Sequence, residues 1–197
     1  MKSIDVKGTA RTATGKKASR EIRKAGSVPC NLYGEAKGEN GLPVATSFSA
    51  TQDELRKLVY SPDIYSVNLN IDGKECKAIM KELQFHPVTD KLLHVDFYEI
   101  TETKPIVMEV PIKLSGLAEG VKAGGKLAAS VRKLKVRAPY TAIPEHLDID
   151  VTNLGLGKTI KVAELSFEGL EMVTSPSVVV CQVKMTRSAM SAAAKAE

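Results

Sequence analysis

The clearest fold signal in this chain is residues 64–80, which have the sequence IYSVNLNIDGKECKAIM. Apolar side chains occupy alternating positions on both sides of a central Asp72-Gly73 pair: Val67, Leu69, Ile71, Cys76, Ala78 and Met80. Such alternation is typical of strands with one buried face. An Asp-Gly pair suits a two-residue turn, because both central positions of a primed turn have positive φ. The stretch therefore predicts a β-hairpin.

A short helix is predicted just before the hairpin, over residues 51–60. Thr51 is followed three positions later by Glu54, which is the capping-box pattern of a helix N-terminus. Ser61-Pro62 then ends the helix, because the residue before a proline disfavours the helical conformation. The predicted buried stripe consists of three apolar residues: Leu55, Leu58 and Val59.

A second helix is predicted over residues 16–25, ending at Gly26, because glycine commonly takes the left-handed position after a helix. One face of this helix carries three cations and a hydroxyl within an arc of about 100°. These residues are Lys16, Ser19, Arg20 and Arg23. The far side carries Ala18, Ile22 and Ala25, and we expect it to pack on the protein. The cationic face favours phosphate binding, with a solvated basic face as the alternative.

The pattern changes near residue 100. Residues 101–105 form a polar break that predicts a linker, and Pro111 beyond it indicates an edge strand or a bulge. Alternating apolar residues then recur in three sets: Met108, Val110, Ile112 and Leu114; Leu134, Val136 and Ala138; Leu147, Ile149 and Val151. A more fully apolar strand runs from Val178 to Val183. This spacing predicts an all-β second domain, and the small residues at 187–197 predict a disordered tail.

The charge of the chain is concentrated at its N-terminal end. Its 197 residues are 43% hydrophobic and 26% charged, with a net charge of +5, which allows a real core. Residues 1–24 carry eight basic side chains and two acidic ones, a local net of +6, so the remainder sums to −1. A charge gathered at one end is typical of a nucleic-acid footprint.

The three cysteines do not indicate a disulfide framework. Cys30, Cys76 and Cys181 are too scattered, and each has strand-like neighbours, so we expect small buried side chains in a reducing compartment. The N-terminal residues lack the apolar run of a signal peptide, and no stretch approaches 18 apolar residues. A cytoplasmic protein is therefore expected.

Two segments imitate a phosphate-binding loop. Residues 120–126 match its first seven positions, but Leu127 stands where a hydroxyl should bind magnesium. The following residues alternate like a strand, so no helix N-terminus is expected there. Residues 157–159 end such a motif correctly, but Thr152 replaces its first glycine. Both segments are interpreted as turns.

Signs of catalysis are equally weak. His94 and Asp96, with His86 nearby, imitate a non-haem iron site, but the spacing and Pro87 argue against a metal. Hydrogen bonding to nucleic-acid edges or sugar hydroxyls is the preferred role for His94 and Asp96. No nucleophile elbow is present, and no cysteine has an identifiable base. We expect no enzyme activity, no metal and no cofactor.

Motifs of the first 100 residues combine into one specific pattern. They comprise Arg11, Gly15, Lys16, Ala18, Ser19, Arg20 and Arg23; then Gly26, Val28, Pro29, Leu32, Tyr33 and Gly34; then 81–87 and 93–97. In this order and spacing they resemble the bacterial large-subunit ribosomal protein family that includes the general stress protein Ctc. Residues 110–112, 120–125, 143–145 and 178–183 look like the extra domain of its longer members.

The resemblance implies an N-terminal β-barrel that docks on the loop E region of 5S rRNA, in its widened minor groove. The implied RNA-binding residues are Arg11, Lys16, Ser19, Arg20, Arg23, Tyr33, Lys81, His94 and Asp96. The chain departs from the family pattern at Cys30 and Asn31, which replace small or aliphatic residues, and at Glu21 in a commonly basic stretch. Glu21 projects away from the cationic arc, so we expect little effect on binding.

The combined prediction is a mainly β protein with short helices. A 5S rRNA-binding β-barrel at 1–100 is followed by an all-β domain at 101–186 and a tail at 187–197. The expected function is that of a structural constituent of the large ribosomal subunit, bound to 5S rRNA and neighbouring ribosomal proteins in the cytoplasm, with no membrane or small-molecule substrate. The alternative is a stress-linked accessory protein whose second domain binds another protein. The role of a basic cluster in that domain stays open: Arg132, Lys133, Lys135 and Arg137.

Overall fold

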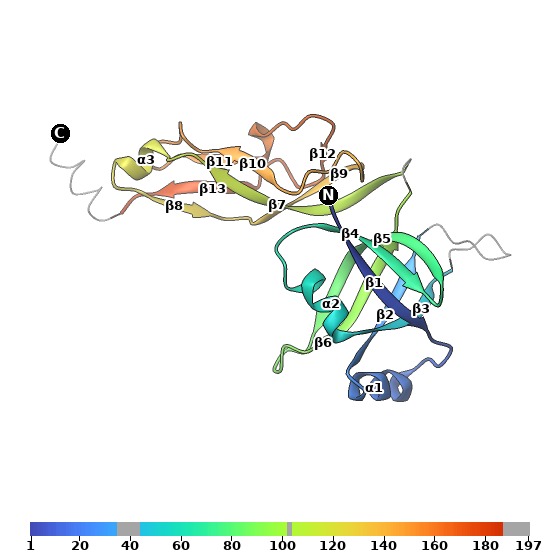
Figure 1. Cartoon of the computed structure of the whole chain (residues 1–197). Helices are drawn as coiled ribbons and strands as arrows, with labels where there is room; N and C mark the ends of the chain where they lie inside the picture. Colours follow the sequence, from blue (N-terminus) through green and yellow to red (C-terminus); the bar gives the residue numbers. More distant parts are fainter. Residues whose placement is uncertain (35–43, 102–103, 187–197) are drawn as a thin grey trace, which may run out of the picture. The chain divides into compact units, whose positions relative to one another are not determined.

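The computed structural model describes residues 1–34, 44–101 and 104–186. The chain forms two compact units, Met1–Lys104 and Pro105–Glu197, both built mainly from strands (Figure 1). Among the described residues, no helix is long and apolar enough to cross a membrane. The predicted tail at 187–197 lies outside the described residues.

The first unit is a closed β-barrel. Its strands are β1 (Lys2–Ala10), β2 (Ser27–Tyr33), β3 (Thr46–Thr51), β4 (Tyr65–Ile71), β5 (Lys74–Phe85) and β6 (Leu92–Glu99). They neighbour one another in the order β1-β3-β2-β6-β5-β4. The barrel closes where β1 pairs in parallel with β4, from Lys2 opposite Tyr65 to Gly8 opposite Ile71. Closure pairs the two edges that an open sheet would leave exposed.

The predicted hairpin is confirmed as β4 and β5. Leu69 lies opposite Cys76, and Asp72 and Gly73 form the turn with φ angles of 48° and 88°. Both angles are positive, as a primed turn requires. The Asp72 carboxylate also accepts a hydrogen bond from the Ala10 N–H at 2.9 Å, which joins the turn to the end of β1.

The predicted capped helix is confirmed as α2 (Gln52–Val59). The Thr51 hydroxyl accepts a hydrogen bond from the Glu54 N–H at 3.4 Å and donates one to the Glu54 carboxylate at 3.2 Å. Leu55 and Leu58 are buried and Val59 is partly buried, so the predicted stripe faces the barrel. This helix covers the side of the barrel formed by β1 and β3.

The barrel interior is filled by inward-facing residues of every strand. Phe48 of β3 and Phe97 of β6 are both fully buried, and their ring centroids lie 5.7 Å apart. Val67 and Leu69 of β4 are also fully buried. Each such side chain contributes about 1.5–3 kcal/mol through removal of apolar surface from water. The barrel core therefore holds the outer faces of β2, β5 and β6 in a fixed register.

The second unit consists of two sheets. Its strands are β7 (Pro105–Ser115), β8 (Lys126–Ala129), β9 (Lys133–Pro139), β10 (Leu147–Asp150), β11 (Thr159–Lys161), β12 (Glu171–Met172) and β13 (Val179–Lys184). One sheet has the order β10-β7-β9-β12 and the other β11-β13-β8. Two short helical turns are present among its described residues: α3 (Glu119–Lys122) and the 3₁₀ turn η1 (Val162–Glu164).

The predicted strands of this unit are confirmed as β7, β9, β10 and β13. The alternating residues of β9 and β10 are buried, which explains their pattern. The patterns do not predict the short strands β8, β11 and β12. The predicted fold class, mainly β with an N-terminal barrel and a C-terminal β domain, is confirmed.

Pro111 does not mark an edge strand, which was one of the two features expected of it, because β7 lies between β10 and β9. Pro111 is the last β7 residue in register with β9, opposite Lys133, and pairing with β10 begins at Ile112. A proline is tolerated there because its nitrogen, which carries no hydrogen, faces the β10 side of β7, where pairing has not yet begun.

The segment that imitates a phosphate loop is not followed by a helix. Gly120 lies in α3, which corrects the interpretation of a simple turn, and β8 begins at Lys126. The prediction that a strand rather than a helix follows this segment is therefore confirmed. The segment therefore lacks the helix N-terminus that binds the phosphate in a true phosphate loop.

The three cysteines are unpaired thiols on strands. Cys30 and Cys181 are buried, whereas Cys76 is partly buried. Burial raises the pKa of Cys30 to about 12 and also raises the pKa of Cys76 and of Cys181. Thiols in this state are poor nucleophiles, which agrees with the predicted structural role.

Candidate nucleic-acid interface

The outer face of β2, β6 and β5 gathers polar side chains from strands that are distant in sequence. On β6, Val95 and Phe97 point into the barrel, so His94, Asp96 and Tyr98 lie on the outside. The pairing register places Asn31 of β2 and Glu82 of β5 on either side of Asp96. Alternation on three neighbouring strands therefore creates one surface across the barrel, here called the polar row. It consists of Asn31, Glu82, His94, Asp96 and Tyr98.

A β-bulge in β5 adds a cation to this row. Met80 pairs with Phe97 and Glu82 with Asp96, so Lys81 is an extra residue without a register partner. Both Lys81 and Glu82 are exposed, whereas a regular strand would place only one of two consecutive residues outside. Bulges redirect side chains in this way. The predicted residue Lys81 thereby lies next to Asp96.

His94 and Asp96 are partly buried neighbours on the outer face. The His94 Nδ1 and the Asp96 Oδ1 lie 3.4 Å apart. Burial lowers the pKa of His94, and the nearby Arg11 and Arg23 charges lower it further, while Asp96 opposes them. The imidazole is therefore neutral at pH 7, with one ring nitrogen able to donate a hydrogen bond and one able to accept.

Arg11 extends the row beyond the end of β1. Its backbone N–H donates to the Ser47 carbonyl at 3.0 Å, and its charge lowers the pKa of both Cys30 and His94. The Nε and Nη1 atoms of Arg11 are buried and have no hydrogen-bond partner among the described residues. Buried donors without partners are uncommon in folded proteins, and an unseen ligand is one explanation.

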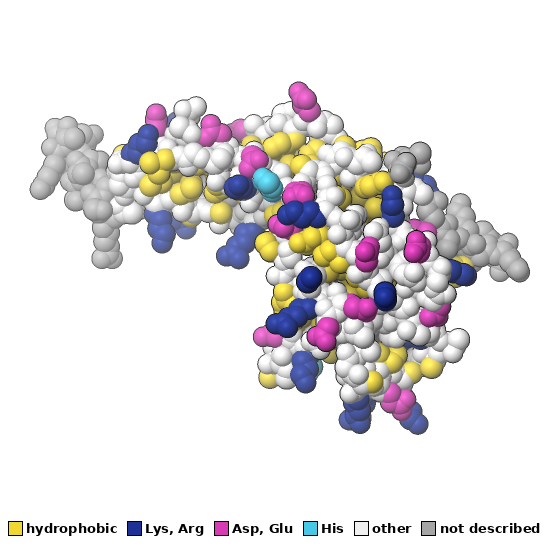
Figure 2. All heavy atoms as spheres, in the orientation of Figure 1, with side chains coloured by type: hydrophobic (Ala, Val, Ile, Leu, Met, Phe, Trp, Pro, Cys, Tyr) yellow, Lys and Arg dark blue, Asp and Glu magenta, His cyan; other side chains and the backbone are white. Residues whose placement is uncertain are grey.

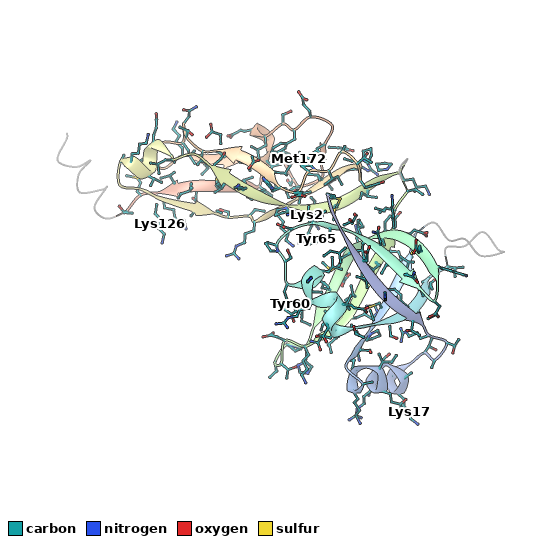
Figure 3. All side chains as sticks on the ribbon, in the orientation of Figure 1. Lys2, Lys17, Tyr60, Tyr65, Lys126 and Met172 are labelled. Atoms are coloured by element: carbon teal, nitrogen blue, oxygen red, sulfur yellow. The ribbon has the colours of Figure 1, made fainter. Side chains whose placement is uncertain are left out.

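The predicted basic helix is confirmed as α1 (Lys16–Lys24), and it packs beside β2. The Arg23 Nε donates to the Leu93 carbonyl of β6 at 3.0 Å, so the helix is joined to the polar row. Lys16 and Arg20 are exposed, and Ser19 is half-buried. Figure 2 shows Lys and Arg side chains protruding where α1 lies, and Lys17 is on its exposed side in Figure 3.

The packed side of α1 differs in part from the prediction. Ala18 and Ile22 are half-buried, as expected, but Ala25 is exposed, and no α1 residue is fully buried. The chain turns away at Gly26, where φ is 79°, so Ala25 ends the helix outside the contact with β2. Glu21 is exposed, as are Lys16 and Arg20, so its predicted direction away from the cationic arc stays a prediction.

Two tyrosines lie at the other end of the polar row. Tyr33 of β2 is in register with Tyr98 of β6, and their rings meet edge to face with centroids 5.8 Å apart. Partial burial raises the pKa of Tyr33, and the charges of Asp96 and Glu82 raise it further. Tyr33 therefore keeps its phenolic proton and can donate a hydrogen bond while offering an aromatic edge.

The predicted residues fall into two groups. Arg11, Arg23, Tyr33, Lys81, His94 and Asp96 meet on or beside the outer face of β2, β6 and β5. Lys16, Ser19 and Arg20 lie on α1, which joins that face through Arg23. Sequence reasoning missed Asn31, Glu82, Gln84 and Tyr98, although alternation along β2 and β6 contains the signal for Asn31 and Tyr98.

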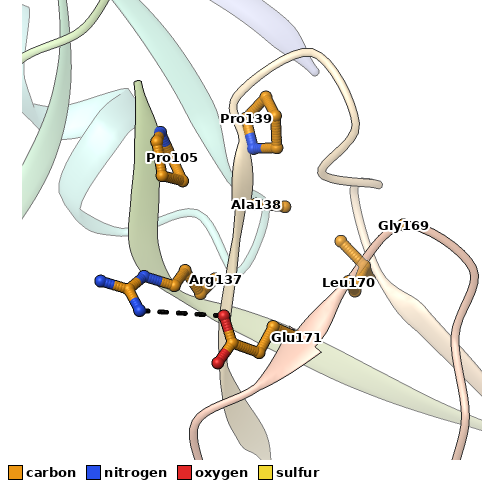
Figure 4. Close-up of a pocket in the computed structure, with 7 residues that line it drawn as sticks. All are labelled: Pro105, Arg137, Ala138, Pro139, Gly169, Leu170 and Glu171. Atoms are coloured by element: carbon orange, nitrogen blue, oxygen red, sulfur yellow. Dashed lines mark ion pairs between the residues drawn. The ribbon is translucent and has the colours of Figure 1, made fainter. Parts of the chain in front are cut away.

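Other candidate sites are weaker. No cluster of three metal-ligating side chains occurs within the described parts of the chain. A hollow of about 480 Å³ in the second unit has apolar walls from Pro105, Pro139 and Leu170 (Figure 4). Arg137 and Glu171 also line it and form an ion pair with each other at 3.8 Å. Because these two charged groups are paired with each other, they make a poor set of polar contacts for a cofactor.

The fold and the site define a two-unit β protein whose candidate interface is a polar surface rather than a pocket. Residues 6–97 match the Ribosomal L25p family, and residues 105–187 match the family described as ribosomal protein TL5, C-terminal domain. The chain is 65% identical to large ribosomal subunit protein bL25 of Phocaeicola vulgatus over 100% of its own length and 99% of the relative.

Two further relatives carry the same name. The chain is 58% identical to the protein of Bacteroides thetaiotaomicron and 54% identical to that of Porphyromonas gingivalis. These alignments cover 100% and 99% of the chain, respectively, and 99% of each relative. The chain belongs to the ribosomal L25p family, in its long two-domain form, and the resemblance found in the sequence is confirmed.

Proposed function

We propose that this chain is a structural component of the large ribosomal subunit and that its barrel binds 5S rRNA in the loop E region. The observation that carries the proposal is the polar row on β2, β6 and β5, which lies beside a cationic helix. The relatives, named as large ribosomal subunit proteins, support the coarser part. The 5S rRNA assignment rests on the residues that match the family motifs.

The mixture of cations and short polar groups suits an RNA minor groove. A-form RNA displays sugar hydroxyls and base edges in a wide, shallow minor groove, flanked by phosphates. In this arrangement His94 and Asp96 meet the groove, while Arg20 and Lys16 of α1 neutralise phosphates. The buried Nε and Nη1 of Arg11 gain partners when RNA oxygen atoms reach them.

The two carboxylates refine this proposal. Asp96 and Glu82 face each other across β6 and β5, where a phosphate would be repelled. Carboxylates instead accept hydrogen bonds from 2′-hydroxyls or from base amino groups. We therefore assign the middle of the row to the groove floor and the end at Arg11 and α1 to the phosphates.

The remaining roles follow from the same proposal. Membership in a ribosomal protein family favours a structural component over an enzyme, with no cofactor or small-molecule substrate. Neighbouring large-subunit proteins are the further partners, and the ribosome in the cytoplasm is the location. The second unit is near-neutral outside its basic cluster at Arg132, Lys133, Lys135 and Arg137. This leaves the alternative of a protein-binding accessory role, which a loss of specific 5S rRNA binding would favour.

A titration of the full chain with 5S rRNA tests the proposal. Arg20→Ala should weaken binding by about 1–3 kcal/mol if Arg20 makes a specific contact. Arg56→Ala is the matched control, because Arg56 is also an exposed arginine on a helix but lies on α2, which covers β1 and β3. Wild-type affinity should fall with salt by about 0.7–0.9 log units per phosphate contact for each log unit of salt.

Two outcomes would contradict the proposal. Binding to 5S rRNA no tighter than to an unrelated duplex would remove the specific assignment. Equal effects of Arg20→Ala and Arg56→Ala would remove α1 from the interface. Circular dichroism of both variants checks that neither change alters the fold.

A further inference from the structure

The end of the β8–β13 sheet brings together cations that are far apart in sequence. Lys126 of β8 lies directly opposite Lys184 of β13, and both side chains are exposed. The Val183 N–H donates to the Lys158 carbonyl at 3.0 Å, so exposed Lys158 lies on the other side of β13. Figure 3 labels Lys126 where β8 begins.

None of these lysines forms an ion pair within 4.0 Å among the residues that the structure describes. The basic cluster noticed in the sequence differs, because two of its members have acidic neighbours on adjacent strands. Lys135 lies 3.7 Å from Glu109, and Arg137 lies 3.8 Å from Glu171. Carboxylates therefore partly compensate the cluster at 132–137. Among the described residues, no carboxylate pairs with Lys126, Lys158 or Lys184.

Two like charges directly opposite each other on neighbouring strands are destabilising. Their Cβ atoms are about 5 Å apart in such a pair, so each ammonium lies in the field of the other. The adjacent positions on the same face are Gln182 and Ala128, which supply no compensating charge. An anion held between the two lysines removes this repulsion.

We propose that Lys126 and Lys184 bind a backbone phosphate of RNA and give the second unit an RNA contact of its own. Two flexible ammonium groups can each meet one non-bridging oxygen of a phosphodiester, and lysine binds phosphate as a point charge. Lys158 extends the positive field to the other side of β13. RNA is favoured over an acidic protein because the chain belongs to a ribosomal protein family. This contact is separate from the barrel surface and does not require the 5S rRNA assignment.

The test uses the full chain and a fluorescent RNA duplex of about 20 base pairs without 5S rRNA sequence, titrated from about 50 to 200 mM KCl. The variant is Lys126→Gln with Lys184→Gln. The matched control is Lys135→Gln with Arg137→Gln, which removes the same charge from positions that have acidic neighbours. The lysine-pair variant should bind more weakly, with a salt slope reduced by about 0.7–0.9 for the lost phosphate contact. The control should change that slope by less than half as much.

Lys184→Glu separates binding from folding. It converts the like-charge pair into an opposite-charge pair, so the melting temperature should rise while duplex affinity falls. A salt slope that both double variants change equally would overturn the proposal. Polyglutamate binding that depends on Lys126 and Lys184 as strongly as duplex binding would also overturn it, in favour of an acidic protein partner. Specific 5S rRNA binding should persist in the lysine-pair variant. A failure of the lysine-pair proposal can therefore be told apart from a failure of the 5S rRNA proposal.

Discussion

Arg11→Met should make the protein more stable. Methionine keeps much of the length and apolar contact of arginine but removes the buried Nε and Nη1 donors, which have no partner among the described residues. A buried polar group without a partner costs about 1–3 kcal/mol. Arg11 as a whole is only partly buried, so we expect the lower end, a gain of about 1 kcal/mol in the free energy of unfolding. Urea unfolding followed by circular dichroism measures it.

The same substitution should weaken RNA binding. If RNA supplies the missing partners, Arg11→Met loses about 1–3 kcal/mol of binding free energy, or roughly 5-fold to 150-fold in affinity for 5S rRNA. The pKa of His94 should also rise, because the Arg11 charge lowers it in the native protein. Fluorescence anisotropy measures the affinity, and NMR of the His94 imidazole measures the pKa.

Arg56→Met on α2 is the control for Arg11→Met, because Arg56 is an exposed arginine away from the polar row. It should change neither the His94 pKa nor the RNA affinity. A loss of stability in Arg11→Met with unchanged RNA affinity would refute the reasoning. Arg11 would then be a structural residue whose guanidinium stabilises the barrel.

Three other substitutions test the fold and the site. Gly8→Ala should cost about 1–3 kcal/mol in urea unfolding, because its Cβ would lie 2.5 Å from the fully buried Phe48 ring, and an unchanged stability would contradict this packing. Thr51→Ala should cost about 0.5–2 kcal/mol by removing the acceptor for the Glu54 N–H, whereas Thr51→Ser should retain most of it. Burial lowers the pKa of His94 from 6.5, so its stabilising contribution is present above pH 6.5 and is lost as pH falls through the lowered pKa. His94→Gln should therefore lose less stability than wild type between about pH 7.5 and pH 5, and an equal loss would exclude His94 as the cause.

Mixed charge on the polar row has a consequence for specificity. Asp96 and Glu82 oppose phosphate binding in the middle of a surface that is cationic at the end formed by Arg11 and α1. Carboxylates in this position disfavour ligands that offer only negative charge, which is one way in which a surface rejects wrong partners. We expect the barrel to discriminate between RNA shapes more strongly than a purely basic surface does.

Features that depend only on neighbouring residues could be predicted from the sequence. The Asp72-Gly73 turn, the Thr51 cap and the cationic arc of α1 are all local, because backbone angles, capping and helix periodicity act within a few positions. Alternation also located the long strands, since burial of one face imposes a period of two. The family motifs contributed the residues that no local pattern connects, such as Tyr33.

Which of these elements come into contact depends on the tertiary fold. The parallel pairing of β2 with β6 places Asn31 beside Asp96, and the bulge in β5 adds Lys81 to the outer face. The β8–β13 register likewise sets Lys126 against Lys184, which are distant in sequence and belong to no shared motif. Strand register is chosen by core packing across the whole sheet, so neither the polar row nor the lysine pair is encoded in any local stretch of sequence.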